Sequence, residues 1–282
     1  MSAIGRPAAV PPHPGVALGR RSGRGSLHHR VAFGVALAAL LAATARADDR
    51  SGCRPAAIGA GRVESVLDGR TVRLADGREV RLAGIEAPAS AKAALETLVS
   101  GREVSLLRLG PESDRYGRLV ALVAVPLGPE PSVQRALLAQ GQARVSAHIG
   151  DKGCAAAFLG AENMARRAGL GLWADPYYVM RKAEDPAGIL AVRGRFAVVE
   201  GKVLSVRESG GVIYLNFGRR FTEDFTVTVL KRHERIFTAA GMALKKLAGQ
   251  HVRVRGLIEQ RGGPWIEAAA PEQIEIAERG HE

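Results

Sequence analysis

One order of short strand-like runs around a single helical segment occurs twice in this chain, and it restricts the fold more than any other feature. Runs rich in Val, Leu and Ile predict strands at residues 63–67, 71–74, 79–85, 104–109 and 119–125. Asp76-Gly77 marks a hairpin turn between the second and third runs. Residues 90–100 have the apolar spacing of a helix, with Ser90 suited to the N-cap and Gly101 to the C-cap. The predicted order is three strands, a helix and two strands.

This order is typical of an OB-type Greek-key barrel. Further helices are predicted at residues 132–140 and 155–168, so the first domain is placed at residues 61–175. The order recurs, with one further short run at its end: strands are predicted at 196–206, 212–217, 225–230, 252–258, 265–268 and 274–276 and a helix at 234–247. Residues 176–194 mix Pro, Gly and charge without a period and are predicted to be a linker. The predicted fold class is mainly β with helices (α+β): an OB-fold barrel and a second, smaller OB-like β-barrel at residues 195–278.

The first 47 residues have the pattern of an export signal. Six Arg and no acidic residue precede Asp48, an apolar run occupies residues 31–45, and Ala45-Arg46-Ala47 fits a cleavage site. The apolar run is shorter than the roughly 20 residues that span a bilayer, although an uncleaved anchor is an alternative. We therefore predict a signal peptide at residues 1–47, a periplasmic or secreted protein, and no membrane span in the mature chain.

The two cysteines, Cys53 and Cys154, are too few for a Cys-rich zinc scaffold. In an oxidising compartment they are predicted to form a disulfide that closes a loop of roughly 100 residues. Two free thiols are the alternative that the sequence leaves open.

The net charge of the chain is +12, from 40 basic and 28 acidic residues. Six of the basic residues and none of the acidic ones lie in residues 1–47, which leaves +6 for the predicted mature chain. This excess favours a polyanionic partner, although basic surfaces also serve solubility.

Three short stretches of the first predicted domain occur in a fixed order. They are VLDGRTV at residues 66–72, VRLAGIEAP at 80–88 and DRYGR at 114–118, and GLGLW follows at 169–173. Over about residues 61–175 their order and spacing resemble the staphylococcal nuclease (thermonuclease) family. The resemblance implies a Ca²⁺-dependent phosphodiesterase that acts on single-stranded DNA and RNA.

The resemblance also assigns the catalytic, phosphate-binding arginines to Arg81 and Arg118. Guanidinium groups neutralise the negative charge on the oxygens of a phosphodiester. Arg115 and Tyr116 belong to the same short motif as Arg118 and are added as candidate nucleic-acid contacts. Purely structural roles are the alternatives to phosphate binding: a salt bridge on the strand for Arg81, and an ion pair with Asp114 for Arg118.

The same comparison places the metal carboxylates at Asp68 and Glu86, but this chain departs from the family there. Arg70 replaces a carboxylate that binds calcium, and a positive charge about 4 Å from a cation costs roughly 4 kcal/mol at an effective dielectric constant of 20. Ala89 replaces the proposed general base, a role that contributes about 10²–10⁴-fold in rate. We expect a degenerate calcium site in which Glu86 pairs with Arg70 or Arg81.

Three functions follow from these residues. The preferred one is binding of phosphodiester or other polyanionic ligands, above all single-stranded nucleic acid, with lost or altered nuclease activity. The alternatives are an active phosphodiesterase with a non-standard divalent-metal site and an envelope module that binds protein or glycan. The predicted second barrel has basic residues near aromatic ones. Together they would suit a groove that binds single strands, and the alternative is that the aromatic residues belong to the core of the barrel. These residues are Arg219, Arg220, Lys231, Arg232, Arg253, Arg255 and Arg261, with Phe217, Phe221 and Phe225.

Overall fold

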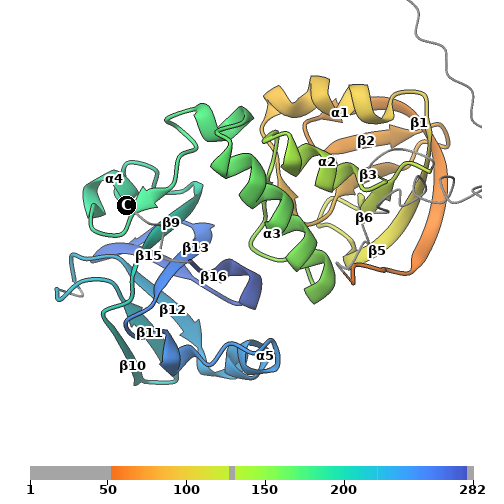
Figure 1. Cartoon of the computed structure of the whole chain (residues 1–282). Helices are drawn as coiled ribbons and strands as arrows, with labels where there is room; N and C mark the ends of the chain where they lie inside the picture. The colour runs from red at the N-terminus through yellow and green to blue at the C-terminus, as the bar shows by residue number, and fades with distance from the viewer. Residues whose placement is uncertain (1–51, 127–130, 221, 278–282) are drawn as a thin grey trace, which may run out of the picture. The chain divides into compact units, whose positions relative to one another are not determined.

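Five strands of the N-terminal half close into a barrel (Figure 1). The computed structural model describes residues 52–126, 131–220 and 222–277, so the predicted signal peptide lies outside the described residues. The strands are β1 (Ala57–Asp68), β2 (Thr71–Leu74), β3 (Glu79–Leu82), β5 (Glu103–Ser113) and β6 (Leu119–Ala124). Their order is β1-β2-β3-β6-β5, with β3 and β6 parallel and the other neighbours antiparallel. The OB-type barrel is therefore confirmed.

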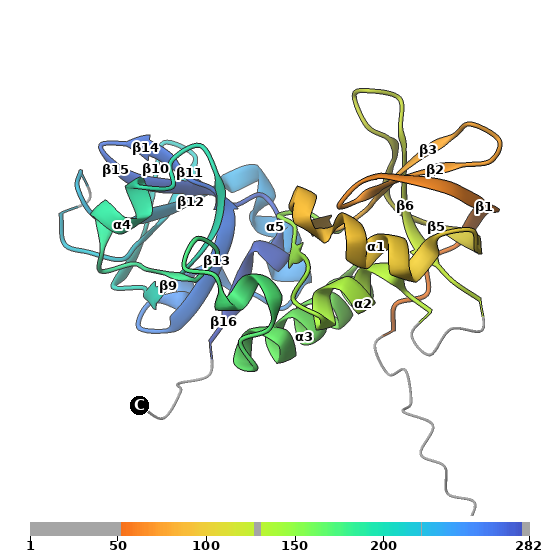
Figure 2. The same ribbon diagram turned by 90° about the horizontal axis from the view of Figure 1, so that it is seen from above.

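Three helices lie side by side along this barrel (Figure 2). They are α1 (Lys92–Val99), α2 (Val133–Ala139) and α3 (Lys152–Arg167), and their fully buried core residues include Leu95, Leu137 and Phe158. The predicted start of α1 at Ser90 is wrong, because residues 89–91 form a 3₁₀ turn without a side-chain cap. The start of α3 is earlier than predicted, because the Asp151 side chain accepts a hydrogen bond from the Cys154 N–H at 2.7 Å.

The strand predicted at residues 79–85 is interrupted by Gly84. Gly84 has a φ of +75°, and a Cβ there would lie 2.9 Å from Phe158 Cε2, so the turn requires glycine. After the turn, β4 (Ile85–Glu86) leaves the barrel and pairs with β7 (Arg144–Val145). This departure carries Glu86 out to a position beside Arg144.

The C-terminal strands repeat the strand order of the barrel. They are β9 (Phe196–Lys202), β10 (Ser205–Ser209), β11 (Val212–Asn216), β12 (Thr226–Leu230), β13 (His251–Leu257), β14 (Glu259–Arg261), β15 (Gly263–Glu267) and β16 (Ile274–Ile276). One sheet has the order β10-β11-β12-β15-β14, with β12 and β15 parallel, and the other has β16-β13-β9-β8, where β8 is Arg181–Lys182. The chain passes from one sheet to the other where β9 leads into β10 and where β13 leads into β14, so the connectivity is OB-like. The hydrogen bonds nevertheless form two separate sheets and not one closed barrel.

Two predictions for this half need correction. The helix predicted at 234–247 is α5 (Glu234–Ala239) followed by a 3₁₀ segment at Leu244–Leu247, because Gly241 takes a φ of +86° and ends the helix. The predicted linker contains β8 (Arg181–Lys182) and α4 (Pro186–Leu190), and Ala183 and Ile189 are buried in the second core. These elements are too short to show a hydrophobic period.

The predicted disulfide between Cys53 and Cys154 is present. It links residues 101 positions apart, with a Cα–Cα distance of 4.3 Å, and so fastens the segment before β1 to α3. Within the described ranges, none of the helices has the length and apolar character needed to cross a membrane.

A buried ion-pair network joins α3 to the C-terminal sheets. The fully buried Arg255 of β13 donates to both carboxylate oxygens of Glu162, at 2.9 and 3.0 Å, and to Val145 O at 3.1 Å. It also contacts Glu275 of β16, and Arg166 lies 3.4 Å from Glu162. Arg255, considered as a nucleic-acid contact from its sequence, is thus a structural residue.

Candidate functional site

Three arginines converge at neighbouring strands of the barrel, and we call them the guanidinium cluster: Arg70, Arg81 and Arg118. Arg70 directly precedes β2, Arg81 lies in β3 opposite Thr71, and Arg118 directly precedes β6. Because β3 pairs with both β2 and β6, the register brings the three residues together. Burial, the charge of Arg70 and then that of Arg118 lower the pKa of Arg81, while Glu86 and Asp114 oppose this effect.

A tight loop fixes the position of Arg118. Asp114 Oδ1 accepts hydrogen bonds from the backbone N–H groups of Tyr116 and Arg118, at 2.9 and 3.1 Å, and Gly117 takes a φ of +77°. Asp114 Oδ2 lies 2.9 Å from Arg118 Nε and 2.7 Å from Nη2. Burial would raise the pKa of Asp114, but these bonds hold it below its usual value. The alternative of pairing with Asp114 thus holds for Arg118 and also orients its guanidinium.

Arg81 differs from the other two members of the guanidinium cluster. Across the described ranges it has no hydrogen bond and no ion pair with another residue, although it is partly buried. The strand salt bridge considered from the sequence is therefore not formed. A partly desolvated guanidinium with unused N–H donors is costly by itself and binds an anionic oxygen strongly.

Arg70 contacts both predicted metal carboxylates, Glu86 with its side chain and Asp68 with its backbone. Its guanidinium contacts Glu86 and lies 3.4 Å from Ile85 O, and its backbone N–H donates to Asp68 Oδ1 at 2.8 Å. Of the two partners expected for Glu86, the structure selects Arg70. A cation here would face a guanidinium and would compete with it for Glu86, so these residues do not fit calcium. Within the described ranges, no three His, Cys, Asp or Glu residues are grouped as metal ligands would be.

Arg115 and Tyr116 form an exposed edge beside Arg118. The Tyr116 ring is 67% exposed, and the Cζ atoms of Arg115 and Arg118 lie 4.7 and 5.2 Å from its centroid. Arg115 Nη2 also donates to the Tyr116 hydroxyl at 2.6 Å. The ring is therefore accessible for stacking but is already flanked by two cations.

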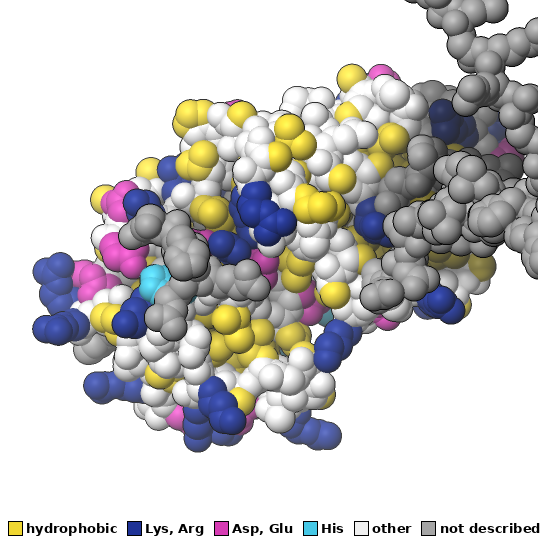
Figure 3. All heavy atoms as spheres, viewed as in Figure 1, with side chains coloured by type: hydrophobic (Ala, Val, Ile, Leu, Met, Phe, Trp, Pro, Cys, Tyr) yellow, Lys and Arg dark blue, Asp and Glu magenta, His cyan; other side chains and the backbone are white. Residues whose placement is uncertain are grey.

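Among the described residues, several side chains considered for a groove in the second half are engaged in the core or in ion pairs. Phe217 and Phe225 pack against one another in the second core, with ring centroids 4.8 Å apart, and Phe221 lies outside the described residues. Arg253 contacts Glu200, and Lys231 lies 2.8 Å from both Glu208 and Glu234. On the face shown in Figure 3, Lys and Arg side chains are spread over this half, with acidic ones among them.

Sequence reasoning missed two groups of residues. One is on the outer side of β11 and β15, where Tyr214 and Trp265 pack edge to face and Arg261 Cζ lies 5.0 Å from the indole centroid. The other surrounds Arg144, which pairs through its backbone with Glu86. Strand alternation could have indicated the first group, whereas no local pattern marks the second.

The comparison with known families agrees with this barrel. Residues 79–175 match the family model described as staphylococcal nuclease homologue. The matched segment contains Arg81, Glu86 and Arg118, whereas Asp68 and Arg70 precede it. No curated protein matches the chain.

Proposed function

The part of this chain from residue 79 to residue 175 is a staphylococcal nuclease-like domain, and from this premise we propose that the chain binds the sugar–phosphate backbone of single-stranded nucleic acid through the guanidinium cluster. The observation that carries the proposal is Arg81, a partly buried guanidinium without a hydrogen-bonding or ion-pair partner among the described residues. A phosphodiester oxygen supplies the charge and the acceptors that this group lacks.

The three arginines of the guanidinium cluster contribute differently to phosphate binding. Arg81 donates directly to phosphate oxygens, and Arg118, held by Asp114, donates with the N–H groups that Asp114 leaves available. Arg70 is largely neutralised by Glu86 and adds less. Contacts of this kind position a strand without reading its bases, and the affinity they give falls steeply with salt.

The same residues argue against efficient hydrolysis by the family's mechanism. Ala89, at the place of the proposed base, has no group that can accept a proton from water. Asp68 and Glu86 both accept hydrogen bonds from Arg70. We therefore propose that the strand is held rather than cut, and that the chain acts outside the cytoplasm, where its disulfide would persist.

Replacing Arg81 with glutamine tests the proposal. We expect the affinity for a fluorescein-labelled oligo(dT), measured by fluorescence anisotropy, to fall about 10–100-fold, since a hydrogen bond to a charged group contributes about 1.5–3 kcal/mol. The dependence of log K on log salt should become shallower by about one.

The matched control is Arg78→Gln. Arg78 lies between β2 and β3 but is bound to Asp76 and to Ala60 O, so the same loss of charge should change the affinity little. Equal effects of the two variants would mean that Arg81 contributes only general charge. Divalent-dependent cleavage that disappears in Arg81→Gln would instead establish the alternative phosphodiesterase.

A further inference from the structure

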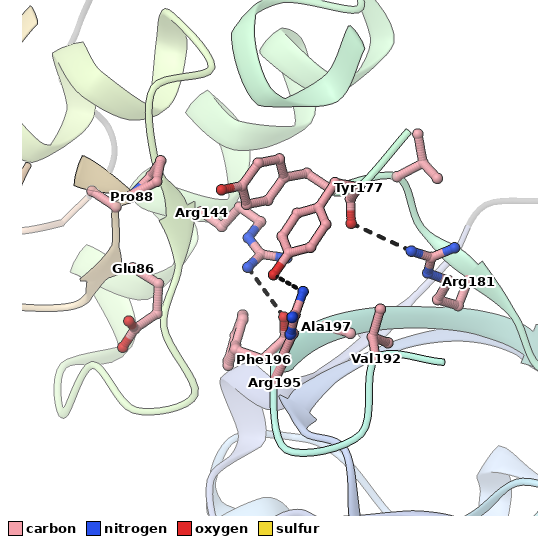
Figure 4. A pocket seen from close by; sticks show the side chains of 12 residues that line it. Glu86, Pro88, Arg144, Tyr177, Arg181, Val192, Arg195, Phe196 and Ala197 are labelled. Carbon is pink, nitrogen blue, oxygen red and sulfur yellow. Dashed lines mark hydrogen bonds between the residues drawn. The ribbon is translucent and has the colours of Figure 1, made fainter. Parts of the chain in front are cut away.

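A cavity of about 210 Å³ is lined in part by Glu86 (Figure 4), the residue that contacts Arg70 of the guanidinium cluster. We call it the Arg144 pocket. Its functional side chains come from β7, from the segment after α3 and from the start of β9. They are Arg144, Tyr177, Tyr178, Arg181, Arg195 and Phe196. The pocket thus combines three guanidinium groups with three aromatic rings.

None of these three arginines is paired with a carboxylate among the described residues. Arg144 Nη2 donates to Phe196 O at 3.1 Å, Arg181 Nη2 to Tyr177 O at 3.4 Å, and Arg195 to the Tyr177 hydroxyl (Figure 4). Glu86 lines the pocket, but its carboxylate is in contact with Arg70. The pocket therefore has positive charge that the described protein atoms leave uncompensated.

Arg144 is unusual because it is buried without a carboxylate partner. Its exposure is 9%, and burial lowers its pKa, although Glu162, Tyr178 and Glu86 oppose this effect. Arg255 provides a comparison within the same chain, because it is fully buried yet contacts Glu162 and Glu275, and its pKa is raised. A buried guanidinium is normally matched by an anion. Arg144 has no such partner among the described residues, and the pocket is the place where an anionic ligand can reach it.

The aromatic rings of the pocket provide stacking surfaces beside its guanidinium groups. Arg144 Cζ lies 5.1 Å from the Tyr178 ring centroid and 5.2 Å from that of Phe196. Tyr177 packs edge to face on Tyr178 at 4.7 Å and is 46% exposed, so part of its ring is available to a ligand. Nucleobases stack on aromatic rings of this kind, with guanidinium groups contacting the adjoining phosphates.

Glu86 makes the pocket and the guanidinium cluster neighbours. Its side chain contacts Arg70 of the cluster, and its backbone pairs with that of Arg144. We propose that the Arg144 pocket binds one nucleotide unit of the strand held by the cluster, with a phosphate at Arg144 and Arg195 and the base against the tyrosines. This inference rests on the proposed function and adds a base-contacting subsite to it.

The test uses the full chain with exposed pocket residues replaced, so that folding is retained. Arg195→Gln should weaken oligo(dT) binding about 10-fold and make the salt dependence shallower by about one. The matched control Arg193→Gln removes a neighbouring exposed charge, which binds Gln260 and does not line the pocket, and should leave the affinity unchanged.

Tyr177→Ala separates base stacking from phosphate binding. We expect it to weaken oligo(dT) about 10-fold and to weaken an abasic oligonucleotide of the same length much less, through the lost hydrogen bond from Arg195 alone. Equal weakening for both strands would overturn the base-binding part of the inference.

The failure of the inference can be told from that of the proposed function. If Arg81→Gln weakens binding while Arg195→Gln and Tyr177→Ala do not, the pocket is no part of the site and the proposed function stands. If all three variants bind as the native chain does, the proposed function itself is wrong.

Discussion

Replacing Arg255 with methionine will lower the free energy of unfolding by about 3–5 kcal/mol. The substitution removes the bidentate partner of Glu162, which is 1% exposed, and a partner of the partly buried Glu275, so the two carboxylates keep only Arg166, at 3.4 and 3.8 Å. Urea denaturation followed by circular dichroism measures the loss.

Two companion variants identify the cause. Arg253→Met, on the same strand, breaks a partly exposed contact with Glu200 and should cost about 1 kcal/mol or less. Adding Glu275→Gln to Arg255→Met should restore part of the stability, because one uncompensated charge is then gone while Glu162 keeps Arg166 as its partner. A loss below about 1 kcal/mol for Arg255→Met alone would contradict the burial of this network.

Replacing Cys53 with alanine will have the second large effect. The disulfide closes a loop of about 100 residues, and the chain-entropy relation gives about 4–5 kcal/mol for its loss. Cys53 is the better position because Cys154 is fully buried, so its replacement would add a packing defect. Unfolding of the native chain with and without reductant supplies the control, and the reduced native chain should match Cys53→Ala. Equal stability in both redox states would contradict the prediction.

The elements that sequence reasoning placed well are those whose signal is local. Strands such as β2 and β6 repeat Val and Leu, and Asp76-Gly77 marks its own turn. The errors arise where tertiary structure decides. Gly84 interrupts a run of strand-forming residues because Phe158, more than 70 positions later, fills the space beside it. The short elements β8 and α4 are held by a core that consists mostly of residues from the C-terminal strands.

The residues of the candidate site also differ in whether a local motif or the tertiary structure identifies them. The motifs with fixed spacing predict Arg81 and Arg118 as site residues. Charge alone restricts the predicted ion-pair partner of Glu86 to two arginines. The choice of Arg70 depends on the register of β2 and β3, which the sequence does not give. The Arg144 pocket could not be predicted, because its residues are distributed over about 110 positions and Tyr177 and Tyr178 begin the segment predicted as a linker.

The most direct test of the account compares oligo(dT) binding by the native chain in excess Ca²⁺ and in chelator. Anisotropy gives the affinity, and a denaturing gel of the same samples gives the length of the strand. Because Arg70 contacts Glu86 and Asp68 and Arg81 is available to phosphate, we predict the same affinity in both solutions and an intact strand. Binding that requires Ca²⁺, or a strand shortened only in its presence, would contradict it.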